Sequence, residues 1–262
     1  MIKLKSKAEI EKMAAAGAVV ASVLNVMEHE IGVGVTTRHL DELAEQTIRE
    51  AGGIPTFKGY QGFPASICSS PNAMVVHGVP GEFEVGDGDI LSVDVGVTLD
   101  GFVGDSAWTF AVGAIPEETN ALLNTCEKAL MAGIEQARPG NHIGDISTAV
   151  QKVTEDAGFA VIRSLVGHGV GETMHEDPQV PNFGAASTGP VLQEGMTIAI
   201  EPMITAGTHE IVLADDEWSI SSADGSMSAH FEHTVAVTAD APRVLTRRNV
   251  PEPAVAVNSL LA

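Results

Sequence analysis

The sequence predicts an α+β fold made of two related halves, in which a pair of helices covers the sheet of each half. Four segments carry apolar residues at helical spacing, and the stretches between them alternate in the manner of strands. Sliding the chain by 106 residues lays the second helix pair on the first, with Gly34 on Gly140 and Gly52 on Gly158. This arrangement predicts a functional site between the halves, on the open face of the sheet.

Each helix is expected where a start signal precedes the apolar spacing and a Gly or Pro follows it. The expected helices run from the capping box Ser6–Glu9 to Gly32 and Gly34, from Thr36 or Thr37 to Gly52–Gly53, from Pro116 to Pro139–Gly140, and from Ile143 to Ala157. The strand-like stretches are Gly59–Pro80, Asp89–Val112, Val161–Val170, Met196–Ile204 and Phe231–Val237. One domain is therefore expected over residues 1–250, followed by a tail at 251–262.

The stretch Asp89–Val112 has the pattern of a hairpin. Every odd position in Leu91–Leu99 is apolar, which predicts a strand with one buried face, and Asp100-Gly101 is a strong two-residue turn signal. Closing this turn pairs Leu99 with Phe102, Gly96 with Asp105 and Asp94 with Ala107. Asp94 and Asp105 then share one face as diagonal neighbours. Such carboxylates repel each other unless a cation lies between them, whereas on a solvated face they need no partner.

Composition indicates a globular protein and argues against nucleic-acid binding. A chain of 262 residues that is 44% hydrophobic can bury a large core. A formal net charge of −21 with only 14 Lys and Arg argues against a nucleic-acid-binding surface, which needs clustered basic residues. Cys68 and Cys126 show no paired spacing, so reduced thiols in a cytoplasmic protein are expected.

The apolar run Ala14–Leu24 follows basic residues and resembles the core of a signal peptide. Charged residues at Glu9, Glu11 and Lys12 interrupt its approach, and no small-x-small cleavage site follows it. A buried helix is therefore expected there. No other segment comes near the roughly 20 apolar residues that a membrane span needs, so no membrane association is expected.

Candidate metal ligands lie in strand-like segments of both halves. His168 stands between glycines, and Glu201 and Glu232 interrupt apolar runs. Burying such charges costs several kcal/mol unless they are paired or bound to a metal. Each glutamate taken singly is better explained as an edge-strand carboxylate in water. Together with Asp94 and Asp105, however, they form a set of four carboxylates and one imidazole, which suits a pair of divalent first-row metals.

Five motifs in order resemble those of the type I methionine aminopeptidases. The motifs are H-G-V-P from His77, D-V-G-V-T-L-D-G-F-V-G-D from Asp94 to Asp105, G-H-G-V-G with H-E-D-P-Q-V from His168 to Val180, I-E-P-M at Glu201, and S-A-H-F-E-H-T at Glu232. The resemblance covers the chain from the first helix to about Thr246. It implies the pita-bread α+β fold, with two pseudo-symmetric halves whose helices cover a curved antiparallel sheet.

The resemblance also implies a role for each motif residue. Asp105 and Glu232 would bridge two metal ions, Asp94 would bind one of them, and His168 with Glu201 the other. Glu201 would be the general base and acid. His175 would stabilise the oxyanion and His77 would hold the amide nitrogen, although His77 by itself is also typical of a turn residue.

The resemblance places a pocket for the methionine side chain at Tyr60, Phe63, Cys68, Met174 and Trp218. Thioether sulfur packs favourably against aromatic rings, which suits methionine as the substrate side chain. Met174 stands where many relatives carry an aromatic residue, which changes the shape of the pocket, and Val76 stands where a cysteine is common. Ordinary packing is the alternative role for Tyr60 and Trp218.

The expected function is a dinuclear-metal aminopeptidase that removes the initiator methionine from new polypeptides with a small second residue. The interval between His175 and Glu201 is too short for the helical insertion of type II enzymes, and no amino-terminal domain of the proline-specific kind is expected. The two ions would be drawn from Co, Mn, Fe, Zn or Ni. Nascent amino termini are the expected partners, with the ribosome as a candidate, and a cytoplasmic monomer is expected. The alternatives are an X-Pro aminopeptidase and a non-catalytic binding module of the same fold.

Overall fold

The computed structural model describes residues 1–248, so the expected tail at 251–262 lies outside the described residues. The helices are α1 (Lys7–Glu30), α2 (Thr37–Glu50), α3 (Glu117–Gln136), α4 (Ile143–Asp156) and the short 3-10 helix η1 (Tyr60–Gly62). The strands of the first half are β1 (Ile54–Pro55), β2 (Cys68–Pro71), β3 (Met74–Val76), β4 (Ile90–Leu99) and β5 (Phe102–Ala111). The later strands are β6 (Ala160–Val161), β7 (Val166–Gly169), β8 (Glu176–Pro181), β9 (Thr197–Ile200), β10 (Met203–Thr205), β11 (Ile211–Leu213), β12 (Ile220–Ser222), β13 (Ser228–His230), β14 (His233–Ala236) and β15 (Arg243–Val244).

The four long helices begin and end near the signals that predicted them. Ser6 and Glu9 form the capping box of α1, and Thr36 caps α2 by accepting a hydrogen bond from the His39 amide. Helix α3 follows Pro116 and ends three residues before Pro139. The expected helices are therefore confirmed.

The internal repeat is also confirmed. A shift of 106 residues carries α2 onto α4 and the last residue of α1 onto the last residue of α3. The same shift carries β1 onto β6. The glycines that end the equivalent helices share left-handed backbone angles, with φ of 78° at Gly52 and 85° at Gly158. The two halves are thus built from the same run of helix, helix and strand.

The hairpin β4–β5 has the predicted register, with Asp94 opposite Ala107 and Gly96 opposite Asp105. The expectation that β4 buries only one face is wrong. Its odd-numbered side chains pack against α1 and α2, but Ser92 on the other face is only 3% exposed. The second half of the molecule covers that face, so the two aspartates lie in the interior and not on a solvated sheet.

The expected strands at Met196–Ile204 and Phe231–Val237 are both interrupted, which the apolar patterns did not predict. Strand β9 pairs with β14 through Ile200 and His233, and β10 pairs with β13 through Met203 and His230. The two breaks therefore lie at the same level, and each contains one of the candidate glutamates. The expected runs at 59–80 and 161–170 likewise contain only short strands separated by irregular chain.

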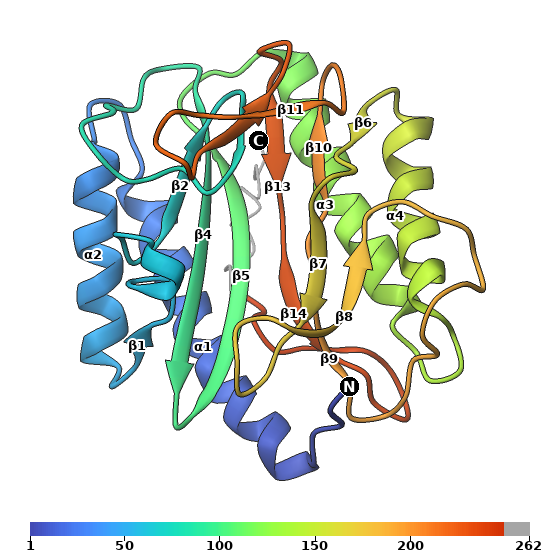
Figure 1. Ribbon diagram of the computed structural model, residues 1–262. Helices are drawn as coiled ribbons and strands as arrows, with labels where there is room; N and C mark the ends of the chain where they lie inside the picture. The colour runs from blue at the N-terminus through green and yellow to red at the C-terminus, as the bar shows by residue number, and fades with distance from the viewer. Residues whose placement is uncertain (249–262) are drawn as a thin grey trace, which may run out of the picture.

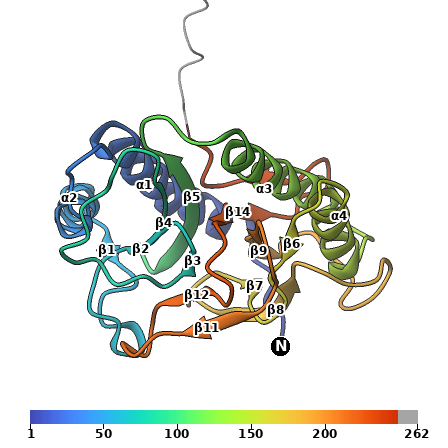
Figure 2. The same cartoon turned by 90° about the horizontal axis from the view of Figure 1, so that it is seen from above.

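The helices and sheets form layers around a central space. Figure 1 shows α1 and α2 beside the first hairpin, and α3 and α4 beside the strands of the second half. Figure 2 shows the helices on the outside of the curved strands, with β11 and β12 across the opposite side. Strands β11, β12 and β3 form a sheet of their own. The curved strands thus lie between the helices and this smaller sheet.

Helix α1 packs closely against the hairpin as a core helix. Glycines meet at the contact, since a Cβ atom on Gly104 would lie 2.7 Å from the Gly17 backbone nitrogen. Among residues 1–248, α1 is the one helix whose length and composition would allow it to cross a membrane, but 56% of its apolar window is buried inside the protein. The buried helix expected for this run is therefore confirmed.

The amino-terminal segment before α1 forms ion pairs with the loop between β7 and β8 and with the start of β8. Lys5 pairs with Glu176 at 2.6 Å, and both side chains are at most 6% exposed. Lys3 pairs with Glu172 at 2.9 Å, but both of these side chains are more than half exposed. Glu176 also accepts hydrogen bonds from the amides of Glu172 and Thr173, so one buried carboxylate holds the turn of this loop.

Replacing Lys5 with Met should lower the free energy of unfolding by about 3 to 5 kcal/mol, because Glu176 would remain buried without its cation. The matched change Lys3→Met should lower it by less than about 1 kcal/mol, since exposed ion pairs contribute little. Urea denaturation of both variants measures the difference. If both variants lose the same free energy of unfolding, burial does not strengthen the contact between Lys5 and Glu176.

Candidate active site

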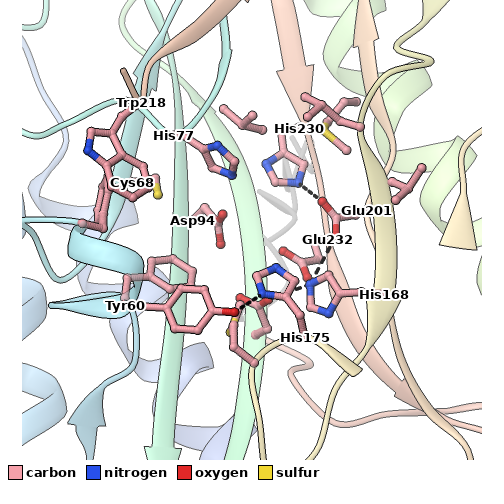
Figure 3. Close-up of a pocket in the computed structure, with 18 of the residues that line it drawn as sticks. Tyr60, Cys68, His77, Asp94, His168, His175, Glu201, Trp218, His230 and Glu232 are labelled. Atoms are coloured by element: carbon pink, nitrogen blue, oxygen red, sulfur yellow. Dashed lines mark hydrogen bonds and ion pairs between the residues drawn. The ribbon is translucent and has the colours of Figure 1, made fainter. Parts of the chain in front are cut away.

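A cavity of about 320 Å³ lies between the two halves, and the twelve candidate residues all line it (Figure 3). They are Tyr60, Phe63, Cys68, His77, Asp94, Asp105, His168, Met174, His175, Glu201, Trp218 and Glu232. These residues come from both halves and, with Trp218, from the loop between β11 and β12. The fold therefore assembles the predicted set in one place, while the role of each residue remains a prediction.

The carboxylates reach the cavity from four different strands or strand ends. Asp94 lies on β4 and Asp105 on β5, whereas Glu201 and Glu232 lie in the two breaks of the second half. Hydrogen bonds between the halves hold this region together. The Asp105 amide donates to the Thr234 hydroxyl at 3.0 Å, and the Glu232 amide donates to the Ala107 carbonyl at 2.9 Å.

His168 directs one ring nitrogen toward the carboxylates. Its Nδ1 lies 2.9 Å from the Gly169 carbonyl, which can only accept a hydrogen bond, so Nδ1 carries the proton. The free Nε2 lies 3.6 Å from Asp105 Oδ2 and 3.5 Å from Glu201 Oε1. Asp105, His168 and Glu232 each place a ligand atom within 4.8 Å of the others.

Several buried atoms of this group have no hydrogen-bond partner within residues 1–248. They include Asp94 Oδ1, Asp105 Oδ1 and Glu232 Oε1. A buried carboxylate oxygen without a partner costs free energy, and a bound cation removes that cost. Oxygen and imidazole donors together suit divalent first-row metals. The donor set and its unpartnered oxygens therefore fit a divalent metal site.

The pKa values of the four carboxyl groups also fit a divalent metal site. Burial, followed by the neighbouring charge of Asp105, raises the pKa of Asp94 well above its usual value. Burial similarly raises the pKa of Glu201 and of Glu232 well above the usual range, and that of Asp105 to about 7. Without a cation, the space thus favours protonated carboxyl groups.

Two further histidines face the cavity from loops. His77 follows β3 with a left-handed backbone, at φ 60°, and His175 follows the turn after β7. The Tyr60 hydroxyl lies 2.8 Å from His175 Nδ1, and the ring of His175 lies 4.3 Å from that of His168 between centroids. Burial lowers the pKa of His77 and lowers that of His175 to about 4. Both rings are therefore neutral near pH 7.

The remaining candidate residues form an apolar end of the cavity. Phe63 and Trp218 meet edge to face, with ring centroids 5.2 Å apart. Cys68 and Met174 are each 5% exposed, and burial raises the pKa of the Cys68 thiol well above its usual value. This end of the cavity can hold an uncharged side chain of moderate size.

The sequence interpretation missed several residues of the cavity wall. The apolar ones include Phe57, Leu165 and Met203, whose patterns are those of any core residue. His230 is the missed polar residue nearest the carboxylates, with Nε2 at 3.7 Å from Glu201 Oε2. Its place two residues before Glu232, in a strand-like run, could have indicated that both side chains point the same way.

Comparisons with known proteins agree with this geometry. The family model described as metallopeptidase family M24 matches residues 11–239. A methionine aminopeptidase of Clostridium perfringens is 47% identical, over 94% of this chain and 99% of that protein. The crystal structure of methionine aminopeptidase from Thermotoga maritima has a TM-score of 0.93 at 42% identity, covering 95% of this chain and 100% of that one. A prolidase from Pyrococcus furiosus has a TM-score of 0.74 at 21% identity, covering 94% and 66%, and shares the fold alone.

In the metal-free protein, the contribution of the carboxyl cluster to stability should fall as the pH rises from about 4 through about 7. Over this range the unfolded chain releases carboxyl protons that the folded chain retains, because folding raises their pKa, to about 7 for Asp105. Added Mn²⁺ should raise the melting temperature more at about pH 8 than at about pH 5.5, where protons compete for the same oxygens. Melting curves with Mn²⁺ and with a chelator measure this.

The difference between the two curves is the informative quantity. Histidines whose pKa is lowered by folding, such as His175, reduce stability below about pH 6.5 with or without metal. A metal-induced shift of equal size at both pH values would contradict the carboxylate cluster as the binding site.

Proposed function

The chain belongs to metallopeptidase family M24, and from its identity to a methionine aminopeptidase we infer that it is a metal-dependent methionyl aminopeptidase. It removes the initiator methionine from new polypeptides whose second residue is small. The observation that carries this function is the identity of 47% to a methionine aminopeptidase over 94% of the chain. The pita-bread fold expected from the motifs is that of the solved methionine aminopeptidase from Thermotoga maritima.

The two alternatives are less well supported. The likeness to the Pyrococcus prolidase, at 21% identity, extends to the fold and gives no reason to prefer X-Pro substrates. A binding module without catalysis would not need to keep Asp105, Glu232 and Asp94 buried with unpartnered oxygens. The retained cluster therefore favours a metal-dependent hydrolase over a binding module.

We propose that five side chains hold two divalent ions. Asp94, Asp105, His168, Glu201 and Glu232 would be the ligands, with Asp105 and Glu232 shared between the ions. Asp105 is the most central carboxylate, since it contributes to the raised pKa of Asp94, Glu201 and Glu232 alike. When bound, divalent ions supply Lewis-acid polarisation of the peptide carbonyl and of the attacking water.

The protein's own groups would then move protons and orient the substrate. Glu201 would accept a proton from the attacking water and pass it to the leaving amine. With the Tyr60 hydroxyl donating to its Nδ1, His175 would keep its proton on Nε2 and donate it to the developing oxyanion. His77, across the cavity, would hold the amide nitrogen (Figure 3).

The apolar end of the cavity would bind the methionine side chain. Tyr60, Phe63, Cys68, Met174 and Trp218 enclose it, and Met174 replaces aromatic area with a flexible thioether. A small second residue would be required because bulk next to the scissile bond would displace the reacting carbonyl from the ligand cluster.

The setting of the reaction is part of the same proposal. Substrates would be the amino termini of nascent chains, with the ribosome as a candidate partner. The two cysteines are buried and free, which agrees with reduced thiols in a cytoplasmic protein, and a monomer is part of the proposal. The formal net charge of −21 argues against binding to nucleic acid through a basic patch.

Replacing His175 with Ala should lower turnover about 10² to 10³-fold, the usual loss for one oxyanion donor. Metal content should stay at two ions per chain, because His175 would contact the substrate and not the ions. Single-turnover kinetics and metal analysis of the purified variant check both points, with exposed His39→Ala as the control. If His175→Ala loses an ion while His39→Ala does not, His175 is a ligand and the assignment is wrong.

Peptides that differ at one position should separate the functions. Met-Ala-Ser should be cleaved, norleucine-Ala-Ser more slowly, since a changed apolar side chain alters binding by only about 1 to 3 kcal/mol. Met-Lys-Ser should hardly be cleaved. Release of the first residue by metal-loaded protein measures each rate. Efficient cleavage of Ala-Pro-Ser but not of Met-Ala-Ser would move the assignment to the proline-directed alternative.

A further inference from the structure

His230 lies at the edge of the ligand cluster without a role in the proposed reaction. Its side chain is 2% exposed, and its Nε2 has no hydrogen-bond partner among residues 1–248. The same Nε2 lies 3.7 Å from Glu201 Oε2, and Figure 3 shows the ring beside that carboxylate. A buried polar atom without a partner is costly, so its position calls for an explanation.

We propose that His230 is a positioning residue that donates Nε2–H to Glu201 Oε2 in the working enzyme. This inference rests on the proposed function and adds a residue to that site. The present separation is slightly longer than a hydrogen bond, and such contacts often shorten only when substrate is bound. A small rotation of the carboxylate would bring the two atoms within range.

The surroundings of Glu201 explain why it needs such a partner. Its Oε1 lies 3.5 Å from His168 Nε2, on the side of the ligand cluster, whereas its Oε2 faces His230. Within the described residues, 1–248, these two contacts are the ones that the Glu201 carboxylate makes with polar side chains, and neither is a hydrogen bond in this structure. Without His230, the group could turn about its last bond, and neither oxygen would be held toward the cluster. A donor on Oε2 keeps Oε1 directed at the cluster.

The backbone of His230 is held firmly enough to orient another side chain. The Thr109 hydroxyl accepts from the His230 amide at 3.0 Å and donates to the His230 carbonyl at 2.8 Å. Ser92 on β4 lies 2.8 Å from the same hydroxyl, so this contact connects the hairpin of the first half to β13. The imidazole therefore projects from a stretch of β13 whose backbone amide and carbonyl are both hydrogen-bonded to Thr109.

Two amide substitutions of different reach test the proposal. The Nε2 of glutamine can occupy the place of histidine Nε2, while asparagine is too short to reach Glu201. His230→Gln should bind Mn²⁺ within about 5-fold of the wild type. His230→Asn should bind it about 10 to 100-fold more weakly, the usual effect of removing a hydrogen bond to a metal ligand. Titration calorimetry measures both.

Kinetics on Met-Ala-Ser provide the second measurement. His230→Asn should lower kcat about 10 to 100-fold with KM changed less than about 3-fold, and His230→Gln should restore most of the loss. His230→Leu, which has no donor, should behave like the asparagine variant if it folds. The Asn and Gln pair decides the question even if the leucine variant does not fold.

The proposal is overturned if His230→Gln is as impaired as His230→Asn, because His230 would then act as a metal ligand or by its shape. It is also overturned if His230→Asn matches the wild type in metal affinity and kcat. If the wild type does not release methionine, the proposed function fails, but the metal affinities still decide whether His230 supports Glu201.

Discussion

The structure depends on keeping four carboxylates in one buried space where the halves meet. Burial and mutual repulsion raise the pKa of Asp94, Glu201 and Glu232, so the space favours either protons or cations. Because Asp94 and Asp105 belong to the first half and the glutamates to the second, neutralising the charge also holds the halves together. A cation bound by these carboxylates would therefore stabilise the folded chain.

The internal repeat explains how a symmetric frame produces an asymmetric ligand set. In the first half Ile54 of β1 pairs with Thr98, and in the second half Ala160 of β6 pairs with Thr205. Ile54 and Ala160 are 106 residues apart in the sequence, whereas their partners Thr98 and Thr205 are 107 apart. The second half therefore has one more residue between the two paired strands than the first half. A shift of 107 carries Asp94 to Glu201, which lies in the break between β9 and β10. The second half therefore has glutamate where the first half has aspartate. The Oε1 atom of this glutamate lies close to His168.

The sequence predicted those parts of the fold that local chemistry determines. The Asp100-Gly101 turn and the alternation of β4 determine the register of the hairpin, and capping residues determine the helix ends. The burial of the second face of β4 and the breaks at Glu201 and Glu232 depend on contacts between distant segments, which no local pattern records. His230 was missed although its place two residues before Glu232 is compatible with a shared face. Its run is ordinary strand sequence, and only the folded chain places its Nε2 beside Glu201.

The candidate metal ligands and the candidate substrate-binding residues lie on parts of the fold that differ in rigidity. The carboxylates and His168 project from paired strands or from the breaks between them, where the ladder limits their movement. The residues that would recognise the substrate, such as Tyr60, His175 and Trp218, lie on η1 and on loops. Loops usually vary in position, but the loop that carries His175 is held at its base by the buried contact of Lys5 with Glu176. A lysine far away in the sequence thus fixes the base of the loop that carries His175, so the amino-terminal segment contributes to the position of this cavity residue.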